Sequence, residues 1–172
     1  MKIQQLLEKY FEDKQLALLH GELQQGHVVS CHLKSVAGSQ LPLIAASVFS
    51  RGAKPHLIVL NDKEEAAYVY NDLQKIIPDF SVLFYPGSYR RPYDVEETDN
   101  ANVLLRAEVL NHINTRKKSP IIVTYPDALF EKVVTRKELK SNTFTIKVGD
   151  KLSTDFLNET LFDFQFQRVD YV

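Results

Sequence analysis

The feature that most constrains the fold is a series of short apolar runs separated by longer segments with helical patterns. Four runs predict β-strands, and they are Val28–Leu33, His56–Leu60, Ser81–Tyr85 and Pro120–Thr124. Continuous apolar runs are typical of strands buried on both faces of a parallel sheet. The part of the chain up to residue 132 therefore predicts an α/β domain built from βαβ units, with helices covering a mostly parallel sheet.

The segments between the runs carry the spacing and the end signals of helices. Apolar residues from Ile3 to Phe11 recur at the i, i+3 and i+4 positions of one helical face. A helix is also expected over Gly38–Arg51, with Pro42 in its first turn and Gly52 as its stop.

Three further helices are expected in this first domain. Asp62 and Glu65 resemble a capping box at the start of one helix, which Pro78 ends. A short helical turn is expected over Asp127–Lys132. A longer amphipathic helix is predicted over Thr98–Thr115, and its apolar pattern runs through Val103, Leu104, Ala107 and Leu110.

The pattern changes after residue 132. Thr143–Val148 and Phe164–Val172 alternate polar and apolar residues, so each predicts a strand with one wet face. Between them, Ser153 is placed to cap a short helix. We therefore expect two domains: an α/β domain over residues 1–132, and the truncated N-terminal part of an α+β domain over residues 133–172.

Composition narrows the class of protein. The chain has 21 Lys and Arg and 22 acidic residues, so its formal net charge is −1. It therefore lacks the basic excess of a dedicated nucleic-acid domain. The one cysteine, Cys31, fits a reducing compartment and is expected to be buried. No apolar run approaches the roughly 20 residues that span a bilayer. We expect a cytoplasmic protein that does not contact a membrane.

The turn after the first apolar run is where a nucleotide-binding α/β domain places its phosphate loop. A working loop has the pattern G-x-x-x-x-G-K-[ST], whose glycine amides, Lys and hydroxyl contact phosphates and Mg²⁺. Here Ser35 and Gln40 stand in place of the two glycines, Leu41 in place of the Lys, and Pro42 in place of the hydroxyl residue. Neighbouring Lys34 lies on the strand side of the turn. The sequence predicts a degenerate nucleotide site, made of Ser35, Gly38, Ser39, Gln40, Leu41 and Pro42.

Other groups of residues favour less specific interpretations. Aromatic and arginine side chains that can stack bases and contact phosphates gather at Tyr85, Tyr89, Arg90, Arg91 and Tyr93. Acids that would repel a phosphate backbone follow at Asp94, Glu96, Glu97 and Asp99. We therefore expect these arginines to pair with the loop's own acids. The histidines lack metal-ligand spacing, and the turn lacks the G-x-S-x-G elbow of a hydrolase, so neither a metal site nor a catalytic residue is predicted.

Several segments, in their order and spacing, resemble the start of the bacterial transcription-repair-coupling factor family, Mfd. They are VAGSQLPLIAAS, the PYD of residues 92–94, VLLRAEVL around Arg106, VTYPDALFEKV, and the final stretch from Gly149 to Val172. The likeness runs from about Leu19 to the end of the sequence. It implies a module similar to the repair helicase UvrB, whose first domain is a RecA-like motor domain without its ATP site.

The resemblance also implies what this module does. It would be a non-catalytic interaction module, without a cofactor of its own, in a factor that displaces stalled RNA polymerase and recruits the repair protein UvrA. UvrA would dock on the second domain, through contact residues that lie mainly past Val172, so none is assigned here. Domains further along the parent would bind RNA polymerase and DNA and would use ATP and Mg²⁺ for translocation. The alternatives are a working RecA-like ATPase or helicase domain with an atypical phosphate loop, and a nucleic-acid-binding module that uses the Tyr/Arg loop.

Overall fold

The chain forms two compact units, residues 1–132 and 133–172. The computed structural model describes residues 3–52, 54–89, 99–115, 119–141, 143–163 and 166. Across these ranges, the helices are all too short or too polar to cross a membrane.

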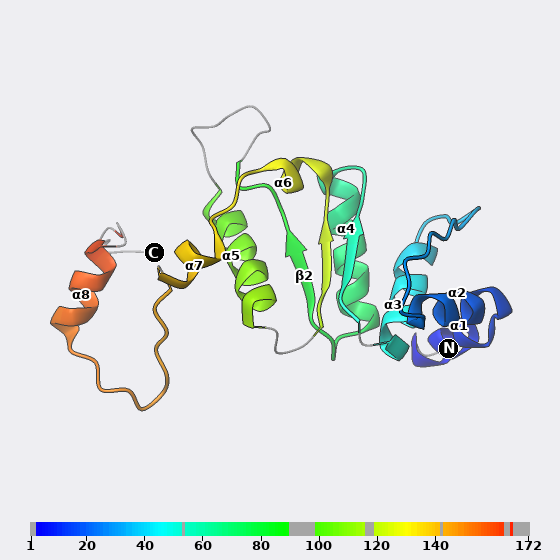
Figure 1. Ribbon diagram of the computed structural model, residues 1–172, viewed down its shortest axis with the longest axis horizontal. Helices are drawn as coiled ribbons and strands as arrows, with labels where there is room; N and C mark the ends of the chain where they lie inside the picture. The colour runs from blue at the N-terminus through cyan, green and yellow to red at the C-terminus, as the bar shows by residue number, and fades with distance from the viewer. Residues whose placement is uncertain are drawn as a thin grey trace. The chain divides into compact units, whose positions relative to one another are not determined.

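A three-stranded parallel sheet forms the centre of the first unit (Figure 1). Its strands are β1 (His56–Val59), β2 (Val82–Tyr85) and β3 (Ile121–Thr124), in the order β1-β3-β2. His56 and Val82 are both in register with Ile121, so the two outer strands pair with the same central strand. The sheet confirms the predicted α/β class, and it is consistent with a RecA-like domain.

Two helices cover opposite faces of this sheet. Tyr70 of α4 (Lys63–Ile76) stacks on Phe84 of β2 with ring centroids 5.3 Å apart. The next residue, Tyr85, faces the other way, as alternate residues of a strand do. Arg106 of α5 (Asn100–Thr115) lies over its ring at 4.3 Å. Figure 1 shows α5 and α4 on either side of the strands.

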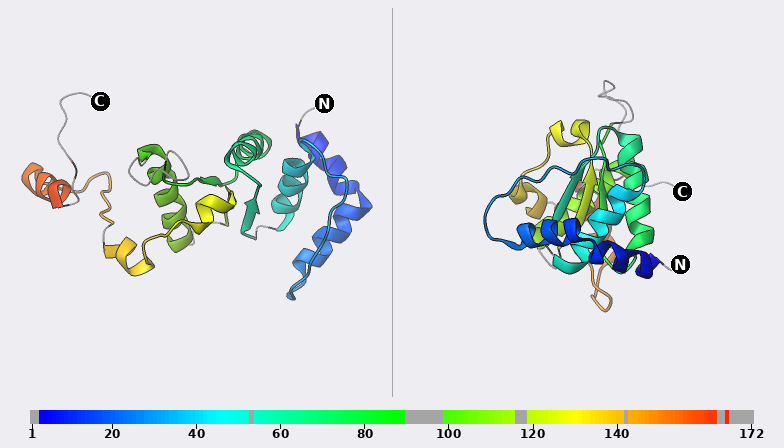
Figure 2. Two further views of the ribbon diagram at one scale, coloured as in Figure 1. Left: turned by 90° about the horizontal axis from the view of Figure 1, so that it is seen from above. Right: turned by 90° about the vertical axis from the view of Figure 1, so that its right-hand side faces the viewer.

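Three N-terminal helices extend the unit beyond α4. α3 (Gln40–Gly52) packs on α4, and α1 (Ile3–Glu12) and α2 (Lys14–Gln24) pack on α3, as Figure 2 shows. Phe49 of α3 is fully buried, and its ring meets those of His56 and Phe80 edge-on at 5.1 and 5.4 Å.

Five predicted helices are confirmed, namely α1, α3, α4, α5 and α6 (Pro126–Phe130). At the start of α4, the amide of Glu65 donates to Asp62 Oδ1 at 2.8 Å, as a capping box requires. Glu65 itself accepts from the amide of Asn61, at 3.2 Å, and not from that of Asp62. α2 (Lys14–Gln24) was not predicted from the sequence, although its cap, Asp13, accepts hydrogen bonds from two amides of the first turn.

The predicted strand Val28–Leu33 does not form. The segment is irregular and mostly exposed, and its Cys31 is exposed where we expected it to be buried. The run was predicted from its apolar ends, but Ser30 to His32 interrupt it, and strand propensity depends on packing against neighbours. β1 also has an uncovered face, on which Leu57 and Val59 are 59% and 47% exposed. The prediction of a strand buried on both faces is therefore wrong for β1.

The buried face of α5 differs from the expected one. Among the predicted residues, Val103 and Leu104 are exposed, whereas the helix buries Asn102, Arg106 and Val109. An apolar count misses this face because an ion pair and two backbone carbonyls satisfy Nη1 of its arginine inside the fold.

The second unit contains α7 (Arg136–Ser141) and α8 (Thr154–Asp163). The cap at Ser153 is confirmed, since its Oγ accepts from the amides of Asp155 and Phe156 at 3.2 and 3.4 Å. Thr143–Val148 is not a strand, because it has no ladder partner among the described residues. The strand predicted over 164–172 lies outside the described residues, apart from Phe166, which is not in a strand.

Candidate functional site: the turn before α3 and two hollows

The turn that enters α3 is closed by its own hydrogen bonds. Ser35 and Gly38 have positive φ angles of 62° and 55°, a region that is uncommon for a residue other than glycine. The amide of Ala37 donates to Gln40 Oε1 at 3.0 Å, and the amide of Gln40 donates to the Ala37 carbonyl at 3.2 Å. Two amide hydrogens that a phosphate loop would turn toward a ligand are therefore used within the turn.

The other loop residues also lack the groups that bind phosphate. Leu41 carries no charge, and Pro42 is buried and has no amide hydrogen. The hydroxyl of Ser39 donates to Asp72 Oδ2 of α4 at 3.3 Å. A carboxylate at this position repels an anion. The degenerate nucleotide site stays a prediction, and these contacts are consistent with it.

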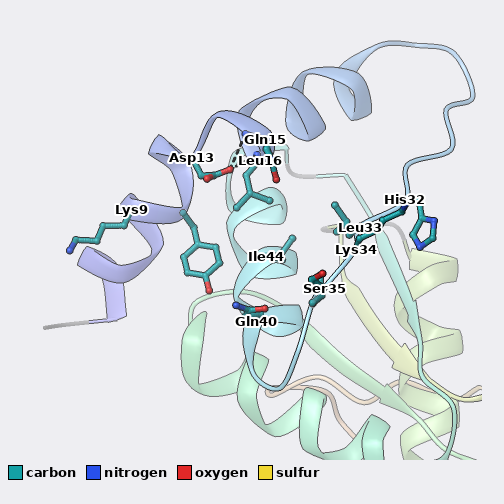
Figure 3. Close-up of a pocket in the computed structure, with 12 residues that line it drawn as sticks. Lys9, Asp13, Gln15, Leu16, His32, Leu33, Lys34, Ser35, Gln40 and Ile44 are labelled. Atoms are coloured by element: carbon teal, nitrogen blue, oxygen red, sulfur yellow. Dashed lines mark hydrogen bonds between the residues drawn. The ribbon is translucent and has the colours of Figure 1, made fainter.

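One hollow of about 430 Å³ lies between the α1–α2 corner, residues 32–36 and α3. Figure 3 shows Leu16 of α2, Gln40 and Ile44 of α3 and Ser35 of the crossing segment around it. Its charged lining residues are Lys9, Asp13 and Lys34, and His32 also lines it.

A second hollow, of about 680 Å³, lies between the turn, the start of α3 and α4. Leu33 and Val36 line both hollows, so the same segment separates them. The loop residues Ser39 and Leu41 line the second hollow, together with the carboxylates of Glu65 and Asp72 and no basic residue among those described. The second hollow, which most of the predicted loop residues line, is therefore acidic.

A buried polar cluster occupies the carboxyl ends of β2 and β3. Arg106 is 6% exposed, and its Nη1 donates to the carbonyls of Pro86 and Ala128 at 2.8 and 3.1 Å. The same nitrogen lies 2.8 Å from Glu131 Oε2. The hydroxyl of Ser88 donates to Glu131 Oε1 at 2.6 Å. Ligands often bind at this edge of α/β sheets, but here the polar groups mainly contact one another.

Two tyrosines complete this cluster. The amide of Gly87 donates to Tyr125 Oη at 2.8 Å, and the hydroxyl of Thr124 donates to the carbonyl of Tyr85 at 2.7 Å. Burial raises the pKa of both phenols, and the hydrogen bond from Gly87 opposes part of the rise at Tyr125. Within the described residues, Arg106 Nη2 and the Asn102 amide nitrogen are buried without a partner. The sequence carries no signal that singles out this pair, because α5 contains several other polar residues, among them Glu108, Asn111 and Asn114.

The structure describes only part of the other candidate sites, the Tyr/Arg loop and a metal site. Tyr85 is buried beneath Arg106, so it is not available to stack a base. Residues 90–98, which include Arg90, Arg91, Tyr93 and three of the four acids, lie outside the described residues, and so do residues 167–172. In the part of the chain that the structure describes, no three His, Cys, Asp or Glu side chains are grouped so that they could hold a metal ion.

The parallel sheet, its covering helices and the turn before α3 define a mixed α/β domain consistent with the RecA-like class. The chain is similar to two curated repair proteins. It is 26% identical to UvrABC system protein B of Methanosarcina acetivorans over 149 residues, which are 80% of this chain and 22% of that protein. It is 28% identical to the transcription-repair-coupling factor of Bacillus subtilis over 143 residues, 81% of this chain and 12% of that protein.

A further UvrABC system protein B, from Dehalococcoides mccartyi, is 24% identical over 150 residues. No protein-family model matches the chain. The resemblance indicated by the sequence, to UvrB and to the coupling factor, is confirmed over four fifths of the chain. The chain spans about a fifth of the length of these UvrB relatives and about an eighth of the coupling factor.

Proposed function

We propose that this chain is a non-catalytic interaction module of a DNA-repair factor of the transcription-repair-coupling type. The names of its relatives support a role in nucleotide excision repair and in transcription-coupled repair. The observation that carries the non-catalytic part is the closed turn at α3, where Gln40 caps the Ala37 amide and Asp72 accepts the Ser39 hydroxyl.

The whole protein would do more than this part of it. In the proposal, the unit from residue 133 onward belongs to the domain that docks UvrA, mainly through residues after Val172. Other parts of the parent would contact RNA polymerase and DNA, would use ATP and Mg²⁺ for translocation, and would displace stalled polymerase. The proposed site of action is the cytoplasm.

Calorimetric titration with MgATP tests the non-catalytic proposal. We expect no saturable heat, because Leu41 stands where the motif needs a Lys and Pro42 stands where it needs a hydroxyl. The amides of Ala37 and Gln40 are already used within the turn. Micromolar affinity would contradict the proposal.

The runner-up function is a working RecA-like ATPase with an atypical phosphate loop. One observation favours it: Lys34 and Lys9 line the hollow beside Ser35 and Gln40. This alternative predicts ATP hydrolysis that Lys34→Ala abolishes and Lys75→Ala, on α4 away from both hollows, leaves unchanged. The main proposal predicts no hydrolysis by either variant or by the unsubstituted chain.

A pulldown of UvrA tests the docking proposal. We expect weak or no capture by this chain and clear capture by a chain extended by about 50–80 residues, enough to add most of a small domain. Equal capture by both would contradict our assignment of the contacts to residues after Val172.

A further inference from the structure

We propose that the acidic hollow beside the degenerate turn is a docking groove for an arginine side chain, carried with an apolar neighbour on a segment of a partner protein. The inference deepens the proposed interaction module and rests on it. The position at which the sequence predicts a degenerate phosphate loop would then take a ligand of the opposite charge.

One face of α4 forms the acidic wall. Glu65, Tyr68, Val69 and Asp72 follow the i, i+3, i+4 and i+7 spacing that brings side chains onto one helical face, and all four line the hollow. Val69 is buried and forms apolar floor, whereas the ring of Tyr68 is 75% exposed. The two half-buried carboxylates flank this aromatic and aliphatic pair.

In each carboxylate, one of the two oxygens accepts hydrogen bonds that hold the side chain in place. Glu65 Oε2 accepts from the side-chain amide of Asn61 at 2.8 Å, and Asp72 Oδ2 accepts from the Ser39 hydroxyl. Among the described residues, Glu65 Oε1 and Asp72 Oδ1 accept no hydrogen bond. The groove therefore presents two oriented acceptors whose positions the fold has already fixed, which lowers the entropic cost of binding.

The facing wall is apolar. Val36, Leu41 and Pro42 contribute it from the turn and the first turn of α3. The volume of about 680 Å³ falls within the usual range of ligand pockets and has room for a long side chain with an apolar neighbour.

Charge complementarity selects the occupant. A phosphate or a nucleotide would meet two carboxylates, and a purely apolar segment would strip water from them without compensation, which is costly. A guanidinium offers several donors in a planar fork that fits carboxylates, and it stacks on aromatic rings such as that of Tyr68. An arginine pairs with one of the two carboxylates, which lie about 10 Å apart along the axis of α4, and can stack on the exposed ring between them. The other carboxylate adds to the negative potential of the groove, and the apolar neighbour of the arginine covers the facing wall.

The test uses the ¹⁵N-labelled full chain and the dipeptide N-acetyl-leucyl-arginine amide, followed by NMR. We expect saturable shifts centred on Glu65, Tyr68 and Asp72, weakening as salt rises because the attraction between partly exposed charges is screened. The matched probe carries citrulline, which has the shape of arginine without its charge. Its affinity should be lower by about tenfold or more, since charge-assisted hydrogen bonds are lost.

Variants of α4 localise the effect. Asp72→Asn and Glu65→Gln should each weaken binding of the arginine probe, and Tyr68→Leu should weaken it roughly threefold through the lost cation–π contact. Glu64→Gln, on the same helix but outside the hollow, is the matched control and should bind as the unsubstituted chain does. Equal binding of the citrulline probe, shifts elsewhere in the protein, or an equal loss in the Glu64→Gln control would overturn the inference.

A titration of the same sample with MgATP separates the two proposals. Saturable shifts at Gly38 and Ser39 with MgATP would overturn the non-catalytic function. Absence of shifts with the arginine probe would overturn only the docking groove.

Discussion

Replacing Arg106 by methionine removes the charge that joins the end of β2 to α6. The side chain keeps its volume but loses the bonds from Nη1 to the Pro86 and Ala128 carbonyls and the contact with Glu131. It also leaves the Glu131 carboxylate, which is 12% exposed, without a cation. We therefore expect the variant to be folded but clearly less stable.

The size of the loss follows from burial. Removing one partner of a buried ion pair costs about 3–5 kcal/mol. Two donors from Ser88 still reach the carboxylate of Glu131, so the lower end, about 3 kcal/mol, applies. For a chain of this length that corresponds to a drop in melting temperature of about 6–12 °C.

Urea unfolding followed by circular dichroism measures the effect. Arg51→Met is the matched control, because Arg51 is exposed and lies 3.8 Å over the ring of Phe11, a contact that contributes about 0.5–1 kcal/mol at such sites. In the double variant Arg106→Met/Glu131→Met, the loss should be smaller than the sum of the single losses, since no buried charge is left unpaired. A loss for Arg106→Met no larger than for Arg51→Met would refute the reasoning.

Three other predictions concern stability. Burial raises the pKa of Tyr85 and Tyr125 in the folded protein. The free energy of unfolding is therefore unaffected below the unfolded pKa of about 10, and it falls as the pH rises from there through the folded pKa. The urea midpoint should fall in alkali, and a constant midpoint during tyrosinate formation would contradict this. Asp62→Ala removes the cap of α4 and should cost about 1 kcal/mol in urea unfolding, whereas Asp62→Asn, which can still cap, should cost much less. Leu73→Ala empties a fully buried site and should cost about 2–5 kcal/mol. Leu57→Ala on the uncovered face of β1 should cost far less, and equal losses at the two leucines would show that this face is covered in solution.

Helix caps, helix stops and apolar runs in the sequence predicted the helices and strands that depend mainly on such local signals. Pro78 and the Asp62 cap bound α4 as expected, and the apolar runs at 56–60, 81–85 and 120–124 form the sheet. The run at 28–33 failed because a strand also needs a partner edge, which no local pattern specifies. The buried face of α5 was misassigned for a related reason, since the groups that Arg106 contacts when buried, Glu131 and the carbonyls of Pro86 and Ala128, are distant in sequence.

The candidate site was predictable in part. The loop pattern alone predicts which phosphate-binding groups are missing, because each position of that motif has a known chemical role, and the degenerate nucleotide site stays a prediction. The acidic character of the hollow was not predictable, since Asp72 reaches Ser39 from 33 residues further along the chain. Its approach depends on how α3 packs against α4, and that packing is set by tertiary contacts.

The strand order has a consequence for how the protein is made. β1 and β2 do not pair with each other, and both need β3, whose Ile121 stands 65 residues after His56 and 39 after Val82. On the ribosome, the first two strands therefore emerge with unpaired edges and must wait for the third before any of the sheet's hydrogen bonds form. Such long-range closure is slow and leaves the nascent chain open to aggregation. The sheet of the first unit can therefore pair only after residues 121–124 have emerged from the ribosome.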